Sequence, residues 1–399
     1  NALLHLNLRG IQLLLPLGIS FYTFQSSGYL FDVYWKRCKA ERQPLKYALF
    51  VSFFPQILQG PIGRYSRLAD QLYAEHRFEG SNIIRGFERI LWGFFKKMIL
   101  ADWAAVFADA IFEDPAKYNG VALLGVLFYL IQIYADFSGG MDVVIGISSM
   151  FGIELDENFK RPYFAVSTAD FWHRWHITLG TWMKDYVFYP VTLSGWMGKF
   201  GKWGKKVFGK KIGRTLPICV ANLIVFFVVG VWHGAAWKYI VYGMYNGIII
   251  AFSGLMAENY RKWKKKLHIS GKETWYYLFT VIRTFVLVVI SMYFDRADSV
   301  RQAFHMMKQS ITQFAPAQLL LIPAGKQGTA FTPYALLIIG VLCVIQFIVS
   351  VLQERGVKIR ESLAKLPLPV TAAIYFCMLI SIGLFGSTAV ARGFIYAQF

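Results

Sequence analysis

The sequence is poor in charged residues, which make up 16% of its 399 positions. An average soluble domain carries about 25% charged residues, whereas this chain is 56% hydrophobic and 17% aromatic. The mean hydropathy of +0.43 agrees with that balance. This composition excludes an ordinary soluble domain and predicts a polytopic helical membrane protein.

Acidic residues are scarce as well, because 23 Asp and Glu stand against 42 Lys and Arg and leave a net charge of +19. Such a surplus suits nucleic-acid binding, but no zinc finger or other nucleic-acid-binding motif is present in the sequence. The basic residues gather between apolar segments, at residues 196–214, 261–272 and 355–365. Basic runs in that position mark cytoplasmic loops of membrane proteins. The sequence therefore predicts that the protein contacts membrane lipids and does not bind nucleic acid.

Cysteine is rare too, and its four positions are far apart: Cys38, Cys219, Cys343 and Cys377. They have neither the spacing of metal ligands nor that of a disulfide framework, so their expected role is packing. The chain opens at Asn1, with neither a methionine nor a cleavable signal pattern. Its native N-terminus is therefore expected to lie further upstream.

Long apolar segments recur along the chain and predict an all-α polytopic bundle in one domain, residues 1–399. About eight segments are long enough to span a bilayer: residues 11–35, 98–112, 121–137, 216–237, 239–257, 275–294, 333–352 and 369–385. Others are too short or too polar to cross. They predict a re-entrant or broken helix at 47–60, a surface amphipathic helix at 82–97, a short segment at 139–151 and interfacial segments at 154–185 and 298–314.

One ionisable side chain, His233, lies near the end of the apolar run 216–237. Such a group costs free energy in a membrane unless it is paired, so it is a hypothesis about function by default. Gly230 and Gly234 leave room beside it for another backbone or a ligand. The alternative, equally favoured by position alone, is a histidine hydrogen-bonded between packed helices. At about 1.5 Å per residue, His233 lies roughly 25 Å from the cytoplasmic end of its helix, beyond the membrane midplane.

A second group of polar residues comprises Asp170, His173, Arg174 and His176, set among tryptophans. On one helix His173 and His176 would share a face, which is the spacing of a metal-binding pair. Only Asp170 is placed to complete such a site, so no metal is expected. Two interpretations remain open. The segment is either an interfacial helix whose Trp rings meet lipid head groups, or it places a His and an Arg at the cytoplasmic mouth of a pore to meet an anionic cofactor.

Two carboxylates, Asp136 and Asp142, flank a glycine pair at the end of an apolar run. They are costly in a membrane without partners. Asp136 is suited to orient an imidazole or to pair with an arginine, and an ion-pair staple between helices is equally plausible.

Taken together, the motifs of this chain resemble those of the membrane-bound O-acyltransferase family. They are Tyr-Ala-Asp-Phe-Ser-Gly at 134–139, Glu-Asn-Phe-Lys-Arg-Pro-Tyr at 157–163, Phe-Trp-His-Arg-Trp-His at 171–176 and Val-Trp-His-Gly at 231–234. The membrane subunits of bacterial alginate and cell-wall polysaccharide O-acetylation systems are the most similar branch, and residues 15–25, 60–62 and 394–399 also look like that branch. The resemblance covers nearly the whole chain. It implies the family's helical bundle, a multi-pass location in the bacterial plasma (inner) membrane, and further helices before Leu15.

The resemblance implies an O-acyltransferase, most directly an acetyltransferase. It would move the acyl group from a cytoplasmic thioester, acetyl-CoA, across the membrane to a hydroxyl of an extracytoplasmic polysaccharide or of a partner protein. The histidine of the Trp-His-Gly element, His233, maps to the catalytic position, and His176 maps to the second functional position. Histidine suits this chemistry as a base with a pKa near neutrality. A water-poor tunnel would limit hydrolysis of the thioester.

Other residues receive expected roles from the same resemblance. Arg174, Trp175 and Asn158 are expected to bind the donor, since arginine suits phosphate recognition. Polar or aromatic residues expected on the substrate path, or in structural roles near it, are Asp136, Ser138, Trp232, Gln25 and Arg64. No permanently bound cofactor is expected. The chain departs from the branch at His173, where Arg or Asn is more usual, and at Gly180, where Ser is common.

The sequence also bears on partners and on alternative functions. Since the sequence contains no soluble hydrolase-like domain, a separate extracytoplasmic esterase-like partner is implied. D-alanyl transfer to teichoic acid from a carrier-protein thioester stays open as an alternative within the family. A transporter or lipid flippase is the alternative from another class, because broken helices and intramembrane charges also mark transport sites. No inverted repeat supports transport.

Overall fold

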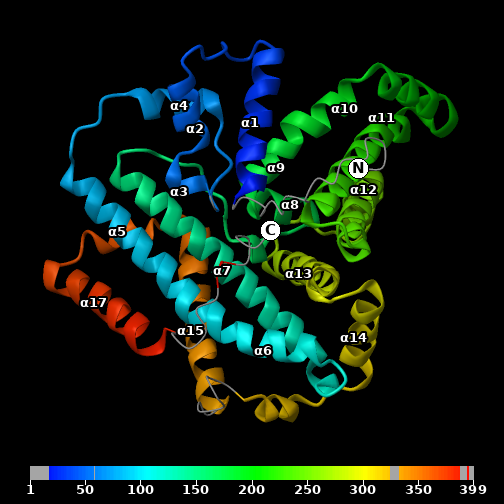
Figure 1. The fold of residues 1–399 in the computed structure, drawn as a ribbon. Helices are drawn as coiled ribbons and strands as arrows, with labels where there is room; N and C mark the ends of the chain where they lie inside the picture. Colours follow the sequence, from blue (N-terminus) through cyan, green and yellow to red (C-terminus); the bar gives the residue numbers. More distant parts are fainter. Residues whose placement is uncertain (1–17, 58, 324–331, 387–392, 395–399) are drawn as a thin grey trace, which may run out of the picture.

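The computed structural model describes residues 18–57, 59–323, 332–386 and 393–394 (Figure 1). In those ranges the chain forms helices, and its one β-type pairing is an isolated bridge between Phe159 and Trp175. The predicted all-helical fold is confirmed. The core is centred on α7 (Ala122–Met150), which packs against α5 (Gly80–Phe94), α6 (Asp102–Glu113) and α13 (Thr274–Arg296).

Six helical segments of the described chain are long and apolar enough to cross a membrane. They contain α7, α11 (Gly195–His233), α12 (Trp237–Lys266), α13, α15 (Thr332–Glu354) and α17 (Leu368–Phe385). The predicted number of eight is not confirmed. The other two predicted spans correspond to α1 (Ile19–Tyr34), of 16 residues, and α6, of 12 residues. Part of the first prediction, residues 11–17, lies outside the described residues.

The broken segment predicted at residues 47–60 is confirmed as two short helices, α2 (Pro44–Val51) and α3 (Phe54–Ile57). A loop then leads into α4 (Tyr65–Tyr73). Proline at the first turn of α2 fits this arrangement, since its missing N–H is not needed there. Figure 1 shows α3 lying between α1 and the central helix α7, and it packs against both.

The helix α7 is longer than predicted. It continues to Met150, whereas residues 139–151 were expected to form a separate short segment. Gly139 and Gly140 do not break it. Gly139 lets a neighbouring helix approach, since a Cβ on Gly139 would lie 2.8 Å from the carbonyl oxygen of Gly93, and one on Gly93 would lie 2.6 Å from that of Gly139. The glycines therefore serve close packing of α5 on α7.

The hairpin predicted from residues 216–237 and 239–257 is confirmed as α11 and α12, which lie side by side (Figure 1). Gly209 has φ of +80° and kinks α11, so that its basic first part folds back on the rest. The apolar part ends at His233, and the next residue, Gly234, has φ of +150°, which favours glycine. His233 is thereby placed at the turn of the hairpin.

Residues 154–185 were expected to lie in the membrane interface, and their depth in the membrane stays a prediction. The segment forms α8 (Thr168–Arg174) and α9 (Ile177–Met183), with α10 (Tyr189–Leu193) following. Phe171, Trp175 and His176 are 1–2% exposed. The rings of Trp175 and His176 pack against Tyr134 and Phe137 of α7, so this part of the segment is buried in the protein. The remaining elements include α14 (Val300–Thr312), at the predicted segment 298–314, and α16 (Ile359–Leu363).

Candidate functional site

The two histidines singled out in the sequence meet at one indole ring. The ring centroid of Trp232 lies 4.8 Å from that of His233 and 5.9 Å from that of His176. The two histidines also interact electrostatically. Both are buried, with 7% of His233 and 2% of His176 exposed. The structure therefore places them in one site, rather than at opposite ends of a passage.

His176 is turned inward by a break between two short helices. The helix α8 ends at Arg174, and His176 adopts a left-handed conformation, with φ of +47°, immediately before α9. The break leaves His173 exposed while His176 is buried. The prediction that these two histidines share a helix face is therefore wrong. Among the described residues, no three His, Cys, Asp or Glu side chains are grouped to hold a metal.

Asn158 fixes the tautomer of His176. Its side-chain oxygen accepts hydrogen bonds from the backbone N–H and from the hydroxyl of Thr178, each at 3.0 Å, and lies 3.2 Å from Nδ1 of His176. A backbone N–H donates only, so this amide atom is the oxygen and Nδ1 of His176 must carry the proton. In the neutral ring the lone pair is then on Nε2. Thr178 was not predicted, although it follows His176 by two residues.

The charge state of His176 follows from its surroundings. Burial, reinforced by the nearby His233 ring, lowers the pKa of His176 to about 3. The ring is therefore neutral at physiological pH. Phe137 of α7 contacts it edge-on, at 4.9 Å between ring centroids.

His233 lies among aromatic rings of α12. Its ring centroid is 5.3 Å from that of Tyr242 and 6.1 Å from that of Tyr239. Asp295 of α13 interacts with it electrostatically. This carboxylate accepts a 2.7 Å hydrogen bond from the hydroxyl of Tyr129. Neither Asp295 nor Tyr242 was predicted, because each belongs to an apolar helix that carries no motif.

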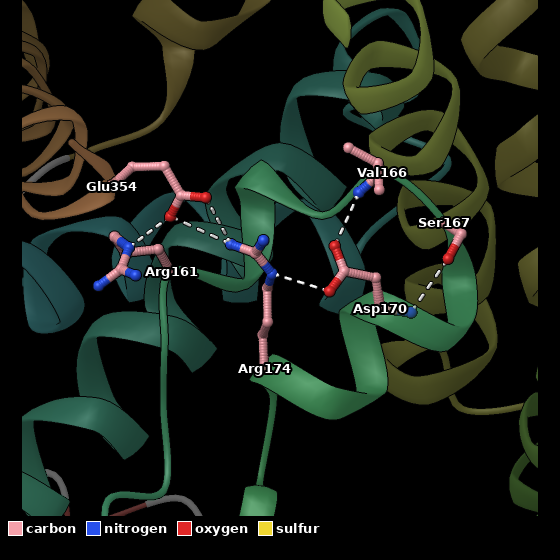
Figure 2. Close-up of polar contacts among 6 residues, drawn as sticks. All are labelled: Arg161, Val166, Ser167, Asp170, Arg174 and Glu354. Carbon is pink, nitrogen blue, oxygen red and sulfur yellow. Dashed lines mark hydrogen bonds and ion pairs between the residues drawn. The ribbon is translucent and has the colours of Figure 1, made fainter. Parts of the chain in front are cut away.

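Arg174 is held by carboxylates of its own chain, as Figure 2 shows. Its Nε donates to Asp170 at 3.0 Å, and its Nη1 donates to Glu354 of α15 at 3.0 Å. Glu354 also accepts from Arg161 at 2.6 Å. Burial opposes the charge of Arg174, but the hydrogen bonds to Asp170 and Glu354 outweigh it and raise the pKa of the guanidinium. The cluster ties α8 to the end of α15. Glu354 was missed in the sequence, where it lies 180 residues from Arg174.

Trp175, the third residue with an expected donor role beside Arg174 and Asn158, is 2% exposed. Its ring stacks on that of Phe171 with centroids 5.5 Å apart. In this structure Trp175 contributes to an aromatic cluster that also contains Tyr134, Phe159 and Tyr163.

Asp136 and Ser138 belong to a buried charge network on α7. Lys97 pairs with Asp136 at 2.8 Å and with Asp102 at 2.7 Å, and Lys96 donates to Ser138 at 2.8 Å. The ion-pair staple considered for Asp136 is confirmed. The sequence placed both lysines on a surface helix, but a π-helical turn, Phe95–Ala101, buries them to 5% and 6% exposure. That part of the surface-helix prediction is wrong.

The remaining expected residues lie on the α1 side of the site. Arg64 pairs with Asp185 at 2.9 Å and stacks on the ring of Tyr186. Gln25 of α1 is 2% exposed. Two further buried glutamines, Gln56 and Gln59, were missed in the sequence, although both lie in the apolar segment 47–60.

Comparison with known proteins adds a family match. The model of the membrane-bound O-acyltransferase family matches residues 40–203 and 205–291. These ranges include both histidines, Asn158 and Trp232.

Curated relatives cover most of this chain. A probable alginate O-acetylase AlgI of Pseudomonas syringae is 37% identical over 296 residues, which are 73% of this chain and 51% of the relative. A peptidoglycan O-acetyltransferase of Helicobacter pylori is 32% identical over 75% of this chain and 57% of its own length. A teichoic acid D-alanyltransferase of Bacillus subtilis is 31% identical over 69% and 67%, respectively. The chain spans about half the length of the alginate relatives that it matches.

Proposed function

Since the chain belongs to the membrane-bound O-acyltransferase family, we propose that it transfers an acyl group from a cytoplasmic thioester to a hydroxyl group beyond the membrane. The observation that carries this proposal is the meeting of His176 and His233 at the ring of Trp232. The chain is a multi-pass protein of the bacterial plasma membrane, with six candidate spans in its described part.

The acyl group is acetyl and the donor is acetyl-CoA, used as a substrate and not held as a resident cofactor. The names of the alginate and peptidoglycan relatives support both acetyl transfer and a polysaccharide acceptor. An extracytoplasmic esterase-like partner would present the acceptor or pass the acetyl group on. In either case the acceptor atom is a hydroxyl oxygen, which must lose its proton as it attacks.

In the reaction His233 acts as the general base. It removes the proton of the acceptor hydroxyl, whose oxygen attacks the thioester carbonyl. A carbon–oxygen bond forms, the carbon–sulfur bond breaks, and the proton passes to the leaving thiolate. His233 ends α11, and the carbonyl groups at a helix C-terminus stabilise the positive charge that forms on the ring. The surrounding rings of Tyr239 and Tyr242 limit access of water and so protect the thioester.

His176 has a positioning role in the proposal. With Nδ1 donating to Asn158, its neutral ring offers Nε2 as a hydrogen-bond acceptor to a donor group of the bound substrates. Asn158 orients the ring, and Trp175 supports the segment by stacking on Phe171. Arg174 is expected to contact the donor through Nη2, since its Nε and Nη1 bind carboxylates.

The test uses the purified protein in proteoliposomes with radiolabelled acetyl-CoA and a polysaccharide acceptor. Wild type is expected to label the acceptor, and His233→Ala is expected to lose at least 100-fold in rate, as removal of a general base does. His173→Ala is the matched control, because His173 is exposed. Normal acetylation by a correctly inserted His233→Ala protein would contradict the proposal.

D-alanyl transfer is the second candidate, and one observation favours it: the chain covers 67% of the Bacillus subtilis D-alanyltransferase, against 51% of the first alginate relative. The acetyl group is preferred because the alginate relatives are the more similar, at up to 37% identity against 31%. Mild base treatment of the acylated surface polymer separates the two. Release of acetate supports the first candidate, and release of D-alanine supports the second.

A further inference from the structure

Three glutamine side chains near the histidine site are buried without hydrogen-bond partners. Gln25, Gln56 and Gln59 are 2%, 1% and 3% exposed. In the part of the chain that the structure describes, neither the amide oxygen nor the amide nitrogen of any of the three is bonded. Native proteins satisfy nearly all buried polar groups. Six unsatisfied atoms in one region therefore indicate a partner other than the described residues.

Gln56 is joined to the support of His176 through a loop. A Cβ on Gly63 would lie 3.2 Å from Oε1 and 3.3 Å from Nε2 of Gln56, so the amide lies directly against this glycine. The neighbouring Ile62 donates its N–H to the hydroxyl of Thr178 at 3.0 Å. That hydroxyl is in turn bonded to Asn158. Gln56 therefore lies against the loop that is hydrogen-bonded to Thr178, and Thr178 belongs to the hydrogen bonds that hold His176.

Gln59 reaches the same region from the other side. Its amide nitrogen lies so close to Gly140 of α7 that a Cβ there would overlap it. Gly140 follows Phe137 by three residues, about one helical turn, and the ring of Phe137 contacts His176. Because residue 140 has no side chain, there is room beside α7 for the amide of Gln59.

Gln25 completes the set from α1. It shares the buried face of that helix with Phe21 and Gly28. Phe21 belongs to one hydrophobic cluster with Ile62 and with Trp182 of α9. The preceding ring, Phe24, is 6.0 Å from the ring of Trp232. The three glutamines therefore approach the histidine site from α1, from α3 and from the loop that follows α3.

We propose that Gln25, Gln56 and Gln59 bind the amide-bearing pantetheine arm of the thioester donor. A glutamine amide donates and accepts hydrogen bonds, and so does each secondary amide of such an arm. This inference rests on the proposed function. The donor is preferred to the sugar acceptor because Gln25 lies nine residues before the end of α1 at Tyr34, about 14 Å. Basic residues that mark the cytoplasm, Lys36 and Arg37, follow that end.

Coenzyme A and a carrier protein present the same arm, so the site by itself fits both sources. The test therefore begins with binding, which requires no turnover. The purified protein is heated with S-acetyl-pantetheine, with acetyl-CoA, with an acetylated carrier protein or with S-ethyl thioacetate, which lacks amides. Stabilisation by acetyl-pantetheine but not by S-ethyl thioacetate is expected. Acetyl-CoA or the carrier protein, whichever gives the larger shift, identifies the source.

The variants are Gln25→Met, Gln56→Met and Gln59→Met, which keep side-chain length and remove the amide. Each is expected to raise the Kd for S-acetyl-pantetheine about tenfold, as loss of one or two hydrogen bonds does. The melting temperature without ligand is expected to stay the same or rise, because no hydrogen bond within the protein is lost. Gln309→Met is the control. Gln309 is 4% exposed on α14, and its amide nitrogen donates to the carbonyl of Pro115. That variant should have a lower melting temperature and an unchanged Kd for S-acetyl-pantetheine.

Two results would overturn the inference. In one, all three variants bind S-acetyl-pantetheine as wild type does, which would mean that the amides hold water only. In the other, the KM for the hydroxyl acceptor rises while binding of the donor is unchanged. Failure of the proposed function is seen separately. A protein that acetylates no acceptor, and yet binds the pantetheine arm in a glutamine-dependent way, supports the site and contradicts acetyl transfer.

Discussion

The side-chain oxygen of Asn158 lies 3.2 Å from Nδ1 of His176, although 18 residues separate them in the chain. The same oxygen accepts two hydrogen bonds from Thr178, and the backbone carbonyl of Asn158 accepts one from Ile177. One fully buried amide therefore holds both the first turn of α9 and the orientation of the imidazole. The family resemblance predicted that Asn158 binds the acyl donor. In the structure its side-chain oxygen instead contacts His176 and Thr178.

Replacing Asn158 by alanine is expected to lower both stability and activity. The N–H of Thr178 and the Nδ1–H of His176 would lose their acceptor in a buried place, which costs about 2–3 kcal/mol. The measurements are the melting temperature and the acetylation rate of the purified protein. Asn259→Ala is the matched control. Asn259 makes an amide contact with a methionine sulfur at 3.3 Å, as Asn158 does, but lies on α12 away from the histidines. Unchanged melting and rate in Asn158→Ala would contradict the role given to this residue.

The cluster of Arg174, Arg161 and Glu354 supports a prediction that separates packing from donor binding. Glu354→Gln removes the charge that pairs α15 with α8, at side chains that are 21–27% exposed. Solvent screening limits the expected loss to about 0.5–1 kcal/mol. The KM for acetyl-CoA should not change. Arg174→Lys should lose similar stability and should also raise the KM for acetyl-CoA, but not the KM for S-acetyl-pantetheine, which lacks the nucleotide phosphates. Equal effects of Arg174→Lys on both donors would show that Arg174 has only the structural role.

The spacing of α11 and α12 is set by glycines near His233. A Cβ on Gly243 would overlap the carbonyl oxygen of Phe226, and it would lie 3.0 Å from the backbone nitrogen of Gly230. Gly243→Ala is therefore expected to push the two helices apart and to cost about 1–3 kcal/mol, with a loss of activity at the adjacent hairpin turn. Gly254→Ala on the same helix is the control, because the atoms nearest to its Cβ are 3.8 Å and 3.9 Å away. It should be neutral or stabilising, since alanine favours helix by about 1 kcal/mol. Equal melting temperatures of the two variants would argue against this packing.

The sequence was informative where local chemistry identifies a residue. His233 could be found because an ionisable side chain in an apolar run is costly, and the hairpin could be found because two apolar runs lie between basic loops. The motifs then added His176. These inferences need no knowledge of which helices touch.

Contacts between distant segments could not be predicted in this way. Nothing near Arg174 indicates that Glu354, 180 residues away, balances its charge. Lys97 looks like a surface residue until the π-helical turn directs it towards Asp136. Gly139 has the composition of a helix break, but the close approach of Gly93 makes it a packing position. In each case the stabilising contact comes from a residue that the local sequence pattern does not specify. The pattern alone therefore predicted the wrong surroundings for the side chain.

Finally, the buried state of His176 predicts how stability depends on pH. Burial lowers the pKa of His176 from 6.5 to about 3. Below pH 6.5 the unfolded chain therefore binds a proton at this residue that the native protein does not bind. The free energy of unfolding must then fall as the pH falls from about 6.5 towards 3, by about 2 kcal/mol at pH 5.

The measurement compares the melting temperatures of wild type and His176→Gln between pH 7.5 and pH 5. The variant is expected to lose less stability on acidification, because glutamine does not titrate. His173→Gln, which changes an exposed histidine three residues earlier, is the control for the substitution itself. A His176→Gln protein with the same pH dependence as wild type would mean that His176 is protonated in the native state as readily as in the unfolded chain. The neutral tautomer held by Asn158 would then be untenable, because a protonated ring carries a proton on both Nδ1 and Nε2.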